Sequence, residues 1–152
     1  MAQLKSGDTA PAFALKDQNG ADKRLSDFAG KKVLLYFYPK ADTPGCTTQS
    51  CSVRDSLSEL SQKGIVALGI SPDLPEKQTK FDKKHGLGFP LLSDPDHAVA
   101  KKYGVWGEKS MYEKKYMGIN RSSFFIDETG AIIQAWYKVA PKDTVPNVMK
   151  II

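Results

Sequence analysis

The sequence has few of the residues that metal sites use. Its 152 residues include only two cysteines and two histidines. A structural zinc site usually takes four ligands in paired short spacings, and neither His85 nor His97 stands in such a pattern. We therefore expect no bound metal and interpret both histidines as surface or capping residues. At this length a core forms without a structural metal or disulfide staples.

Long hydrophobic runs and clustered charge are also absent. No apolar run approaches the ~18 residues of a transmembrane helix, and the N-terminal segment 1–8 lacks the apolar core of a secretory signal. We therefore expect a cytoplasmic protein with no membrane partner. The net charge is +5, but the lysines are scattered in pairs along the chain and only three arginines occur. Nucleic-acid-binding proteins more often gather basic residues in one stripe with aromatics, so we expect no nucleic-acid partner.

The length and composition fit one globular domain. A hydrophobic fraction of 41% with 26% charged residues is typical of a soluble folded chain. No repeat, low-complexity tract or linker rich in glycine, serine or proline divides the sequence. We therefore expect a single domain over residues 1–152.

Two short apolar runs predict buried parallel strands. The segments 33–38 and 65–70 are rich in β-branched and aromatic residues and end at prolines or at a Ser-Pro pair. Between them, Val53, Leu57 and Leu60 have the spacing of one helix face. Strand, helix and strand in this order predict a βαβ unit.

Later segments continue the alternation and define the fold class. The pattern predicts an α/β three-layer sandwich in which helices flank a central mixed β-sheet. The thioredoxin-like fold satisfies this arrangement, although other small α/β folds would as well. The further elements we expect are a helix over 75–85, a strand over 89–92, a short helix from Asp94-Pro95 to 102, a hairpin of 122–126 and 131–137, and a last helix from 143 to the end.

The segment 38–51 holds both cysteines at the end of the first buried strand, where open α/β sheets place their ligands. Thr43 followed by Pro44 is typical of an N-cap and a first helical residue, which puts Cys46 at the third helical position. There, free backbone N–H groups and the positive end of the helix dipole stabilise a thiolate. The alternative is that Cys46 and Cys51 are small buried hydrophobic residues, but Cys46 has no apolar neighbour on either side. Its position favours a nucleophile.

The spacing of Cys46 and Cys51 indicates a transient bond. In an intact helix, residues i and i+5 have Cα atoms ~8.6 Å apart, whereas a disulfide needs them within about 6.8 Å. The two thiols can therefore bond only if the start of the helix unwinds. This suits a redox cycle better than a permanent staple, which the cytosol disfavours.

At these residues the sequence resembles the peroxiredoxins, most closely the bacterioferritin comigratory protein or peroxiredoxin Q group. The P-x3-T-x2-C motif of the family is met by Pro39, Thr43 and Cys46. The resemblance covers essentially the whole chain. It continues in the segments 7–13, 90–94 and 118–127.

The resemblance implies a role for each matching residue. Cys46 would be the peroxidatic cysteine, which a peroxide oxidises to a sulfenic acid. Thr43 would hydrogen-bond the peroxide, and Pro39 would shield the pocket from water. Arg121 would stabilise the thiolate and orient the peroxide oxygens, with Gln49 bracing its guanidinium.

The resemblance also implies the rest of the cycle. Cys51 matches the resolving cysteine of some members and would form an intramolecular disulfide with Cys46, which thioredoxin or a glutaredoxin-like dithiol would reduce. The substrates would be hydrogen peroxide and small organic hydroperoxides, and the role antioxidant defence. No flavin, haem or metal cofactor is implied. Because a C-terminal resolving cysteine is absent, we expect a monomer.

Two other functions remain open from the sequence. A thioredoxin-like fold also suits a protein thiol–disulfide oxidoreductase, although such enzymes use C-x2-C and this chain has C-x4-C. A redox-sensing holdase would use the unwinding of the helix to expose apolar surface to a partner protein.

Overall fold

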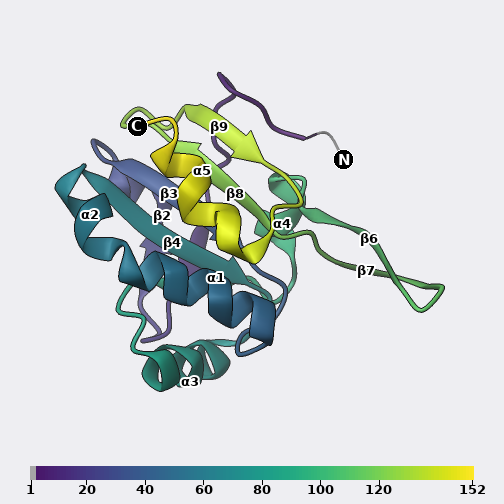
Figure 1. Ribbon diagram of the computed structural model, residues 1–152. Coiled ribbons are helices and arrows are strands. Elements are labelled where there is room, and N and C mark those ends of the chain that lie inside the picture. The colour runs from purple at the N-terminus through teal and green to yellow at the C-terminus, as the bar shows by residue number, and fades with distance from the viewer. Residues whose placement is uncertain (1–2) are drawn as a thin grey trace.

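The structure is a computed structural model that describes residues 3–152, apart from the side chain of Met111 (Figure 1). Met1 and Ala2, which belong to the segment inspected for a signal, lie outside the described residues. Seven strands form one mixed sheet in the order β2-β1-β5-β4-β3-β8-β9, and β6 and β7 pair separately. The strands of the large sheet are β1 (Ala14–Lys16), β2 (Asp22–Arg24), β3 (Lys32–Phe37), β4 (Ile65–Ser71), β5 (Leu91–Ser93), β8 (Ser122–Ile126) and β9 (Ile132–Trp136).

The predicted βαβ unit forms the centre of the sheet. Strands β3 and β4 are parallel, with Val33 opposite Val66 and Phe37 opposite Ile70. The helical connection is interrupted, because α1 (Pro44–Asp55) ends before α2 (Leu57–Gln62) begins. The N–H of Ser56 bonds to the Val53 carbonyl in a tighter turn, so the helix face expected from the spacing is divided between two helices.

Two further predictions are confirmed closely. The helix α3 (Pro75–His85) has the expected bounds, and it ends at Gly86, whose φ of 58° is the left-handed cap that glycine adopts without strain. The hairpin of β8 and β9 is antiparallel. Its turn is held by the Asp127 carboxylate, which accepts hydrogen bonds from the N–H groups of Thr129 and Ala131.

Several boundaries differ from those expected. The strand predicted over 89–92 is β5, shifted to Leu91–Ser93. The helix α4 (Ala98–Lys102) begins later than Asp94-Pro95 suggested, because His97 takes a left-handed φ of 63° just before it. Asp94 still caps this helix by accepting hydrogen bonds from the N–H groups of Val99 and Ala100. The last helix, α5 (Thr144–Met149), stops short of the chain end.

Helices cover both faces of the sheet, as the thioredoxin-like class requires (Figure 1). On the face of α1 and α3, Tyr36 packs in a cluster with Val53 and Phe81. On the opposite face, Leu35 packs in a cluster that includes Val99 of α4. Alternate residues of β3 thus anchor two cores, as the two-residue period of a strand dictates. Among residues 3–152, no helix has the length and apolar character needed to cross a membrane.

A second, two-stranded sheet was not expected from the sequence. Strands β6 (Trp106–Met111) and β7 (Lys114–Ile119) form an antiparallel hairpin that projects from the body of the molecule (Figure 1). Its base leads directly into β8, so this hairpin borders the sheet edge at which β3 ends.

Candidate active site

The end of β3 and the start of β8 meet at one edge of the sheet. The two strands are antiparallel, with Phe37 opposite Ser122. The loop that follows β3 and the residue that precedes β8 therefore come together. This loop contains Pro39 and Thr43, and the residue is Arg121.

Cys46 lies in the first turn of α1, as predicted. Thr43 is the N-cap with extended backbone angles, and Pro44 is the first helical residue. The Cys46 side chain is 1% exposed. Its sulfur therefore lies at the N-terminal end of α1, in a site largely closed to water.

Arg121, the residue before β8, reaches this sulfur. Its Nη1 lies 3.4 Å from Cys46 Sγ and donates a 2.6 Å hydrogen bond to Gln49 Oε1. Gln49 is fully buried and donates from Nε2 to Thr144 Oγ1 at 2.8 Å. Thr144, at the start of α5, Gln49 and Arg121 thus form a chain of contacts that ends at the sulfur.

Because Gly45 has no side chain, the guanidinium of Arg121 has room beside it. A Cβ atom at position 45 would lie 3.0 Å from Arg121 Nη2 and 3.4 Å from Pro141 Cγ. The glycine between Pro44 and Cys46 therefore permits the guanidinium to lie against the first helical turn.

Pro39 and Thr43 lie in the loop between β3 and α1. Both are partly buried. The Thr43 hydroxyl donates to the Lys40 carbonyl at 2.8 Å, which leaves its oxygen free to accept a hydrogen bond. A role as donor to a peroxide requires the hydroxyl to give up its bond to Lys40.

Cys51 lies further along the same helix. Both thiols are free, and Cys51 is partly buried against the cluster that contains Tyr36, Phe81 and Leu87. Because α1 is continuous from Pro44 to Asp55, the structure corresponds to the form in which the thiols are held apart.

A buried hydrogen bond holds α1 to the sheet between the two cysteines. Tyr36 and Ser50 are both inaccessible to solvent, and their hydroxyls lie 2.8 Å apart. Burial raises the pKa of Tyr36 well above its usual value, so the phenol stays neutral and keeps this bond. The sequence marked Tyr36 only as part of an apolar strand, although a buried tyrosine needs a partner for its hydroxyl.

The loop before α1 is tied to α3. The Asp42 carboxylate accepts hydrogen bonds from Lys84 Nζ at 3.0 Å and His85 Nε2 at 3.1 Å. The hydrogen bond from Lys84 is the main cause that lowers the pKa of Asp42. Asp42 and Lys84 border a hollow of about 700 Å³ whose wall also carries Lys40, Lys77, Lys80 and Lys83.

Lys109 is a charged neighbour of the site that the sequence did not indicate. It lies in β6, and its Nζ donates to the Ile119 carbonyl at 2.9 Å. Burial lowers its pKa, and the charge of Arg121 lowers it further, while Cys46 acts in the opposite direction. Lys109 therefore lies within electrostatic range of both Arg121 and Cys46.

Residues 3–152 hold no group of three or more His, Cys, Asp or Glu side chains that could bind a metal. His97 stacks on Trp106 with ring centroids 3.8 Å apart, and His85 pairs with Asp42. Both histidines therefore have structural contacts that account for them.

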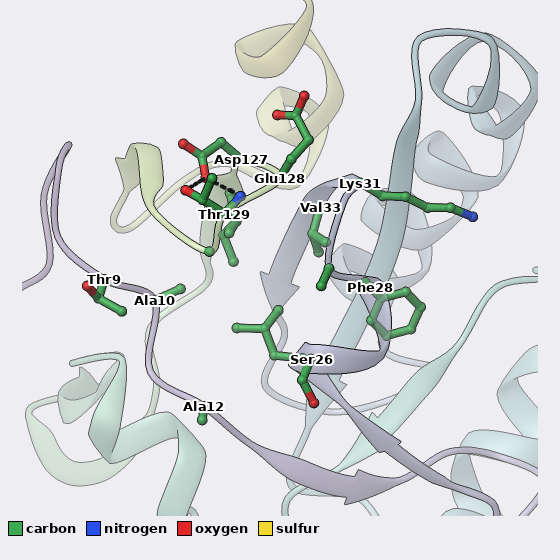
Figure 2. Close-up of a pocket in the computed structure, with 14 residues that line it drawn as sticks. Thr9, Ala10, Ala12, Ser26, Phe28, Lys31, Val33, Asp127, Glu128 and Thr129 are labelled. Carbon is green, nitrogen blue, oxygen red and sulfur yellow. Dashed lines mark hydrogen bonds between the residues drawn. The ribbon is translucent and has the colours of Figure 1, made fainter.

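A separate cavity lies at the other end of β3 (Figure 2). Its volume is about 290 Å³, and its wall is formed by Val33, Phe28 and the turn between β8 and β9. The Asp127 carboxylate in that turn bonds to Thr129, as Figure 2 shows. The hydrogen bonds of its Oδ1 atom all stay within the turn.

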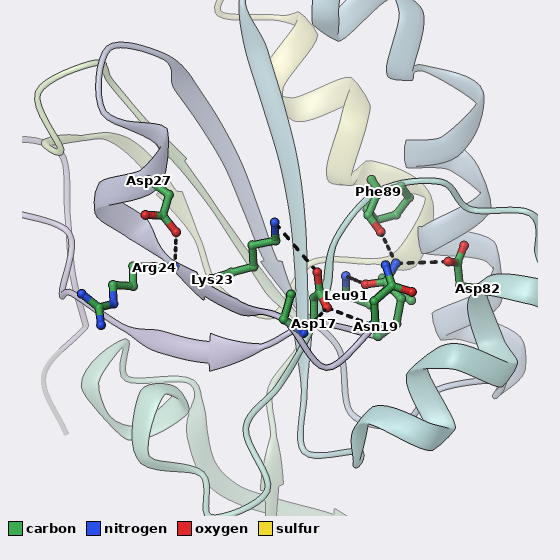
Figure 3. Close-up of polar contacts among 10 residues, drawn as sticks. Asp17, Asn19, Lys23, Arg24, Asp27, Asp82, Phe89 and Leu91 are labelled. Atoms are coloured by element: carbon green, nitrogen blue, oxygen red, sulfur yellow. Dashed lines mark hydrogen bonds and ion pairs between the residues drawn. The ribbon is translucent and has the colours of Figure 1, made fainter.

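The β1–β2 hairpin contains a third polar region (Figure 3). Asp17 accepts hydrogen bonds from the N–H groups of Asn19 and Ala21 and lies 4.0 Å from Lys23 Nζ. Gln18 donates to the Phe89 carbonyl at 2.8 Å and accepts from the Leu91 N–H at 2.9 Å. These bonds fix the hairpin to β5 and to the segment before it.

The chain is similar to known proteins over most of its length. The model of the AhpC/TSA family matches residues 6–135. A putative peroxiredoxin Bcp of Haemophilus influenzae is 57% identical over 94% of this chain and 92% of its own length. Peroxiredoxin Bcp of Escherichia coli is 55% identical over 87% of this chain and 85% of its own length.

Solved structures of related proteins have the same fold as this chain. The crystal structure of a cysteine-to-serine mutant of Xylella fastidiosa PrxQ has a TM-score of 0.92 and 33% identity, covering 99% of this chain and 96% of that one. The bacterioferritin comigratory protein of Xanthomonas campestris, whose structural report concerns alkyl peroxide reduction, has a TM-score of 0.85 and 36% identity, with coverage of 91% and 88%. The predicted thioredoxin-like class is confirmed.

Proposed function

The chain belongs to the AhpC/TSA family as a peroxiredoxin of the Bcp and PrxQ type, and from this membership we propose that Cys46 is its peroxidatic cysteine and Cys51 its resolving cysteine. The protein is a peroxidase. The observation that best supports the assignment of Cys46 is the 3.4 Å contact between its sulfur and Arg121 in the first turn of α1.

In the first step, the Cys46 thiolate attacks one oxygen of hydrogen peroxide or of a small organic hydroperoxide. The O–O bond breaks, the sulfur becomes a sulfenic acid, and the leaving oxygen takes up a proton to give water or an alcohol. The positive charge of Arg121 stabilises the thiolate and the charge that develops on the departing oxygen. The report of alkyl peroxide reduction for the Xanthomonas relative supports organic hydroperoxides as substrates.

Three other residues serve this step. Gln49 holds the Arg121 guanidinium at 2.6 Å and is itself held by Thr144. Thr43 hydrogen-bonds the peroxide after its hydroxyl leaves the Lys40 carbonyl. Pro39 restricts the access of water from the side of β3.

In the second step, the Cys51 sulfur attacks the sulfenic sulfur, water leaves, and an intramolecular disulfide forms. The first turns of α1 must unwind, because helical geometry holds the Cα atoms ~8.6 Å apart. Unwinding between the cysteines separates Tyr36 from Ser50, so this buried hydrogen bond opposes disulfide formation.

The cycle closes when an external dithiol reduces the disulfide. We assign this role to thioredoxin or a glutaredoxin-like protein acting on a cytoplasmic monomer, in a cycle that protects the cell from peroxides. The C-x4-C spacing supports an internal disulfide, because both sulfurs lie on one helix of one chain.

The intact mass of the reduced protein after one equivalent of hydrogen peroxide tests both cysteine roles. The parent should lose two hydrogen atoms, Cys51→Ser should gain one oxygen, and Cys46→Ser should keep its mass. A parent that consumes peroxide no faster than free cysteine would refute the peroxidatic role of Cys46.

Turnover with a thioredoxin system tests the reductant. We expect continuous peroxide consumption with thioredoxin, thioredoxin reductase and NADPH, and little reduction of insulin disulfides. Rapid insulin reduction with slow peroxide turnover would favour a protein thiol–disulfide oxidoreductase. Capture of unfolded proteins by the oxidised form alone would favour a holdase.

A further inference from the structure

The β6–β7 hairpin directs one of its lysines toward the body of the molecule. The hairpin carries solvent-exposed side chains, among them Tyr112 at 91% exposure and Met117 at 52%. Lys114 and Lys115 are also exposed, whereas Lys109 is partly buried. A lysine that loses hydration needs a compensating contact.

The compensating contact is at the base of the hairpin. Lys109 Nζ donates a 2.9 Å hydrogen bond to the carbonyl of Ile119, the last residue of β7. Gly118 provides the path for the lysine stem, because a Cβ atom at position 118 would lie 3.1 Å from Lys109 Cδ. The ammonium group is thereby held beside the corner that connects β7 with β8.

This corner positions the guanidinium of the site. Ile119 is buried and is separated from Arg121 by one residue. Arg121 then extends to Cys46, where its Nη1 lies 3.4 Å from the sulfur. A bond to the Ile119 carbonyl therefore restrains the backbone from which the Arg121 side chain extends.

The charged and titratable groups around Lys109 come from three elements. Arg121 lies at the corner before β8, and Cys46 lies on α1. Within the hairpin, Tyr116 is directly opposite Lys109, and Lys114 lies further along the same face. Burial lowers the pKa of Lys109 most, the charge of Arg121 lowers it further, and Cys46 raises it.

We propose that Lys109 is a positioning residue of the peroxidase site, which restrains the 119–121 corner behind Arg121 and adds a second positive charge to the field at Cys46. The proposal rests on the assigned role of Cys46. The charge of a partly buried lysine changes the ratio of thiolate to thiol by severalfold. This effect of Lys109 on Cys46 is smaller than that of Arg121, which contacts the sulfur directly. Lys109 acts on the sulfur through this field and through Arg121.

The test uses Cys51→Ser protein, so that Cys46 is the single thiol. The rate of alkylation of Cys46 by iodoacetamide is measured against pH, and its reaction with hydrogen peroxide is measured at pH 7. Lys109→Met keeps most of the stem and removes the charge and the hydrogen bond. We expect the pH midpoint of alkylation to rise and the peroxide rate to fall by about three- to tenfold.

Two further variants separate this role from a structural one. Lys109→Arg keeps the charge and should restore the midpoint and most of the rate. Lys115→Met removes an exposed lysine from the other face of the same hairpin and should match the parent. Circular dichroism melts establish that each variant is folded at the assay temperature.

An alkylation midpoint in Lys109→Met equal to that of the parent would overturn the proposal. Lys109→Arg behaving as Lys109→Met would overturn the role of the charge. The failure of the proposed function is distinguishable, because the parent would then not react rapidly with peroxide, whereas the alkylation midpoint would still report the effect of Lys109 on Cys46.

Discussion

The polar side chains at the two ends of β3 differ in their partners. At the carboxyl end, Arg121 extends from the residue before β8 to a buried sulfur on α1, the helix that follows β3. At the amino end, a cavity of about 290 Å³ is bordered by a turn in which Asp127 bonds to its own neighbours. The presence of a hollow therefore does not identify the reactive end. Reactivity is expected where charges from separate elements are directed at one nucleophile.

The largest effect should follow the loss of the Arg121 charge. Arg121→Met keeps an apolar stem in the site but removes the contacts with Cys46 and Gln49. We expect the second-order rate constant for hydrogen peroxide to fall by about 10²–10³-fold, the usual cost of losing a group that stabilises a developing charge. Stopped-flow fluorescence or competition with catalase measures it.

Glu128→Gln at the opposite end of β3 is the matched control. It removes a charge from the wall of the cavity in Figure 2 and should leave this rate constant unchanged. Equal losses in the two variants would mean that the ends do not differ in function.

The next effect is expected at Gly45. In Gly45→Ala the new methyl group lies 3.0 Å from Arg121 Nη2, so the guanidinium must move away from its position near the sulfur. We expect the peroxide rate constant to drop about tenfold while helix propensity raises stability by up to ~1 kcal/mol. Thermal melts and peroxide kinetics on the same preparation show whether stability rises while the rate constant falls.

Ser52→Ala, on the same helix α1, should change neither property strongly. A Gly45→Ala variant with the rate constant of the parent would contradict the prediction, because the peroxide reaction would then not depend on this position of the Arg121 guanidinium.

A smaller effect is expected from Tyr36→Phe. The variant leaves the buried Ser50 hydroxyl without its partner, which should lower the free energy of unfolding by about 1 kcal/mol. Because the same bond opposes unwinding of α1, the disulfide should form faster after oxidation of Cys46. Urea denaturation and quenched-flow thiol counting measure the two effects. Slower disulfide formation would contradict this role.

The smallest effect concerns Asp42 and depends on pH. Its folded-state pKa is lowered, chiefly by Lys84, so its stabilising contribution is present above the ordinary carboxyl value of ~3.9 and is lost as the pH falls through the folded-state value. Asp42→Asn should therefore be slightly less stable than the parent at pH 6, with the two converging as the pH falls below the ordinary carboxyl pKa. Urea midpoints across this range test the expectation. A difference that grows toward acid pH would contradict it.

The central part of the fold could be predicted because its signals are local. The apolar runs of β3 and β4 are short and bounded by turn residues, and Gly86 marks the end of α3. The Thr43-Pro44 pair likewise placed Cys46 in the first turn of a helix. Each of these features depends on a few neighbouring residues.

The elements that were missed lack such local signals. The strands β1 and β2 have three residues each, too few for a visible alternation. The hairpin of β6 and β7 is rich in lysine, and β7 is exposed along most of its length, so it shows little hydrophobic pattern. Its strands are defined by pairing with each other.

The candidate site was predictable only in part, because several of its contacts join residues that are far apart in the sequence. Cys46 and Thr43 were indicated by helix-start chemistry, and Arg121 and Gln49 by family resemblance. The link from Gln49 to Thr144 joins residues 95 positions apart, and the contact of Lys109 depends on an unexpected hairpin. Such partners become visible only when the tertiary structure brings distant segments together.

Labelling of the sulfenic acid tests the central claim, that the carboxyl end of β3 activates Cys46, most directly. Cys51→Ser protein is treated with one equivalent of hydrogen peroxide in the presence of dimedone, and the adduct is located by peptide mass spectrometry. We predict rapid, stoichiometric labelling of Cys46, no labelling of Cys51 in Cys46→Ser, and strongly slowed labelling of Cys46 when Arg121→Met is added. Labelling of Cys46 at an unchanged rate without Arg121 would contradict the account.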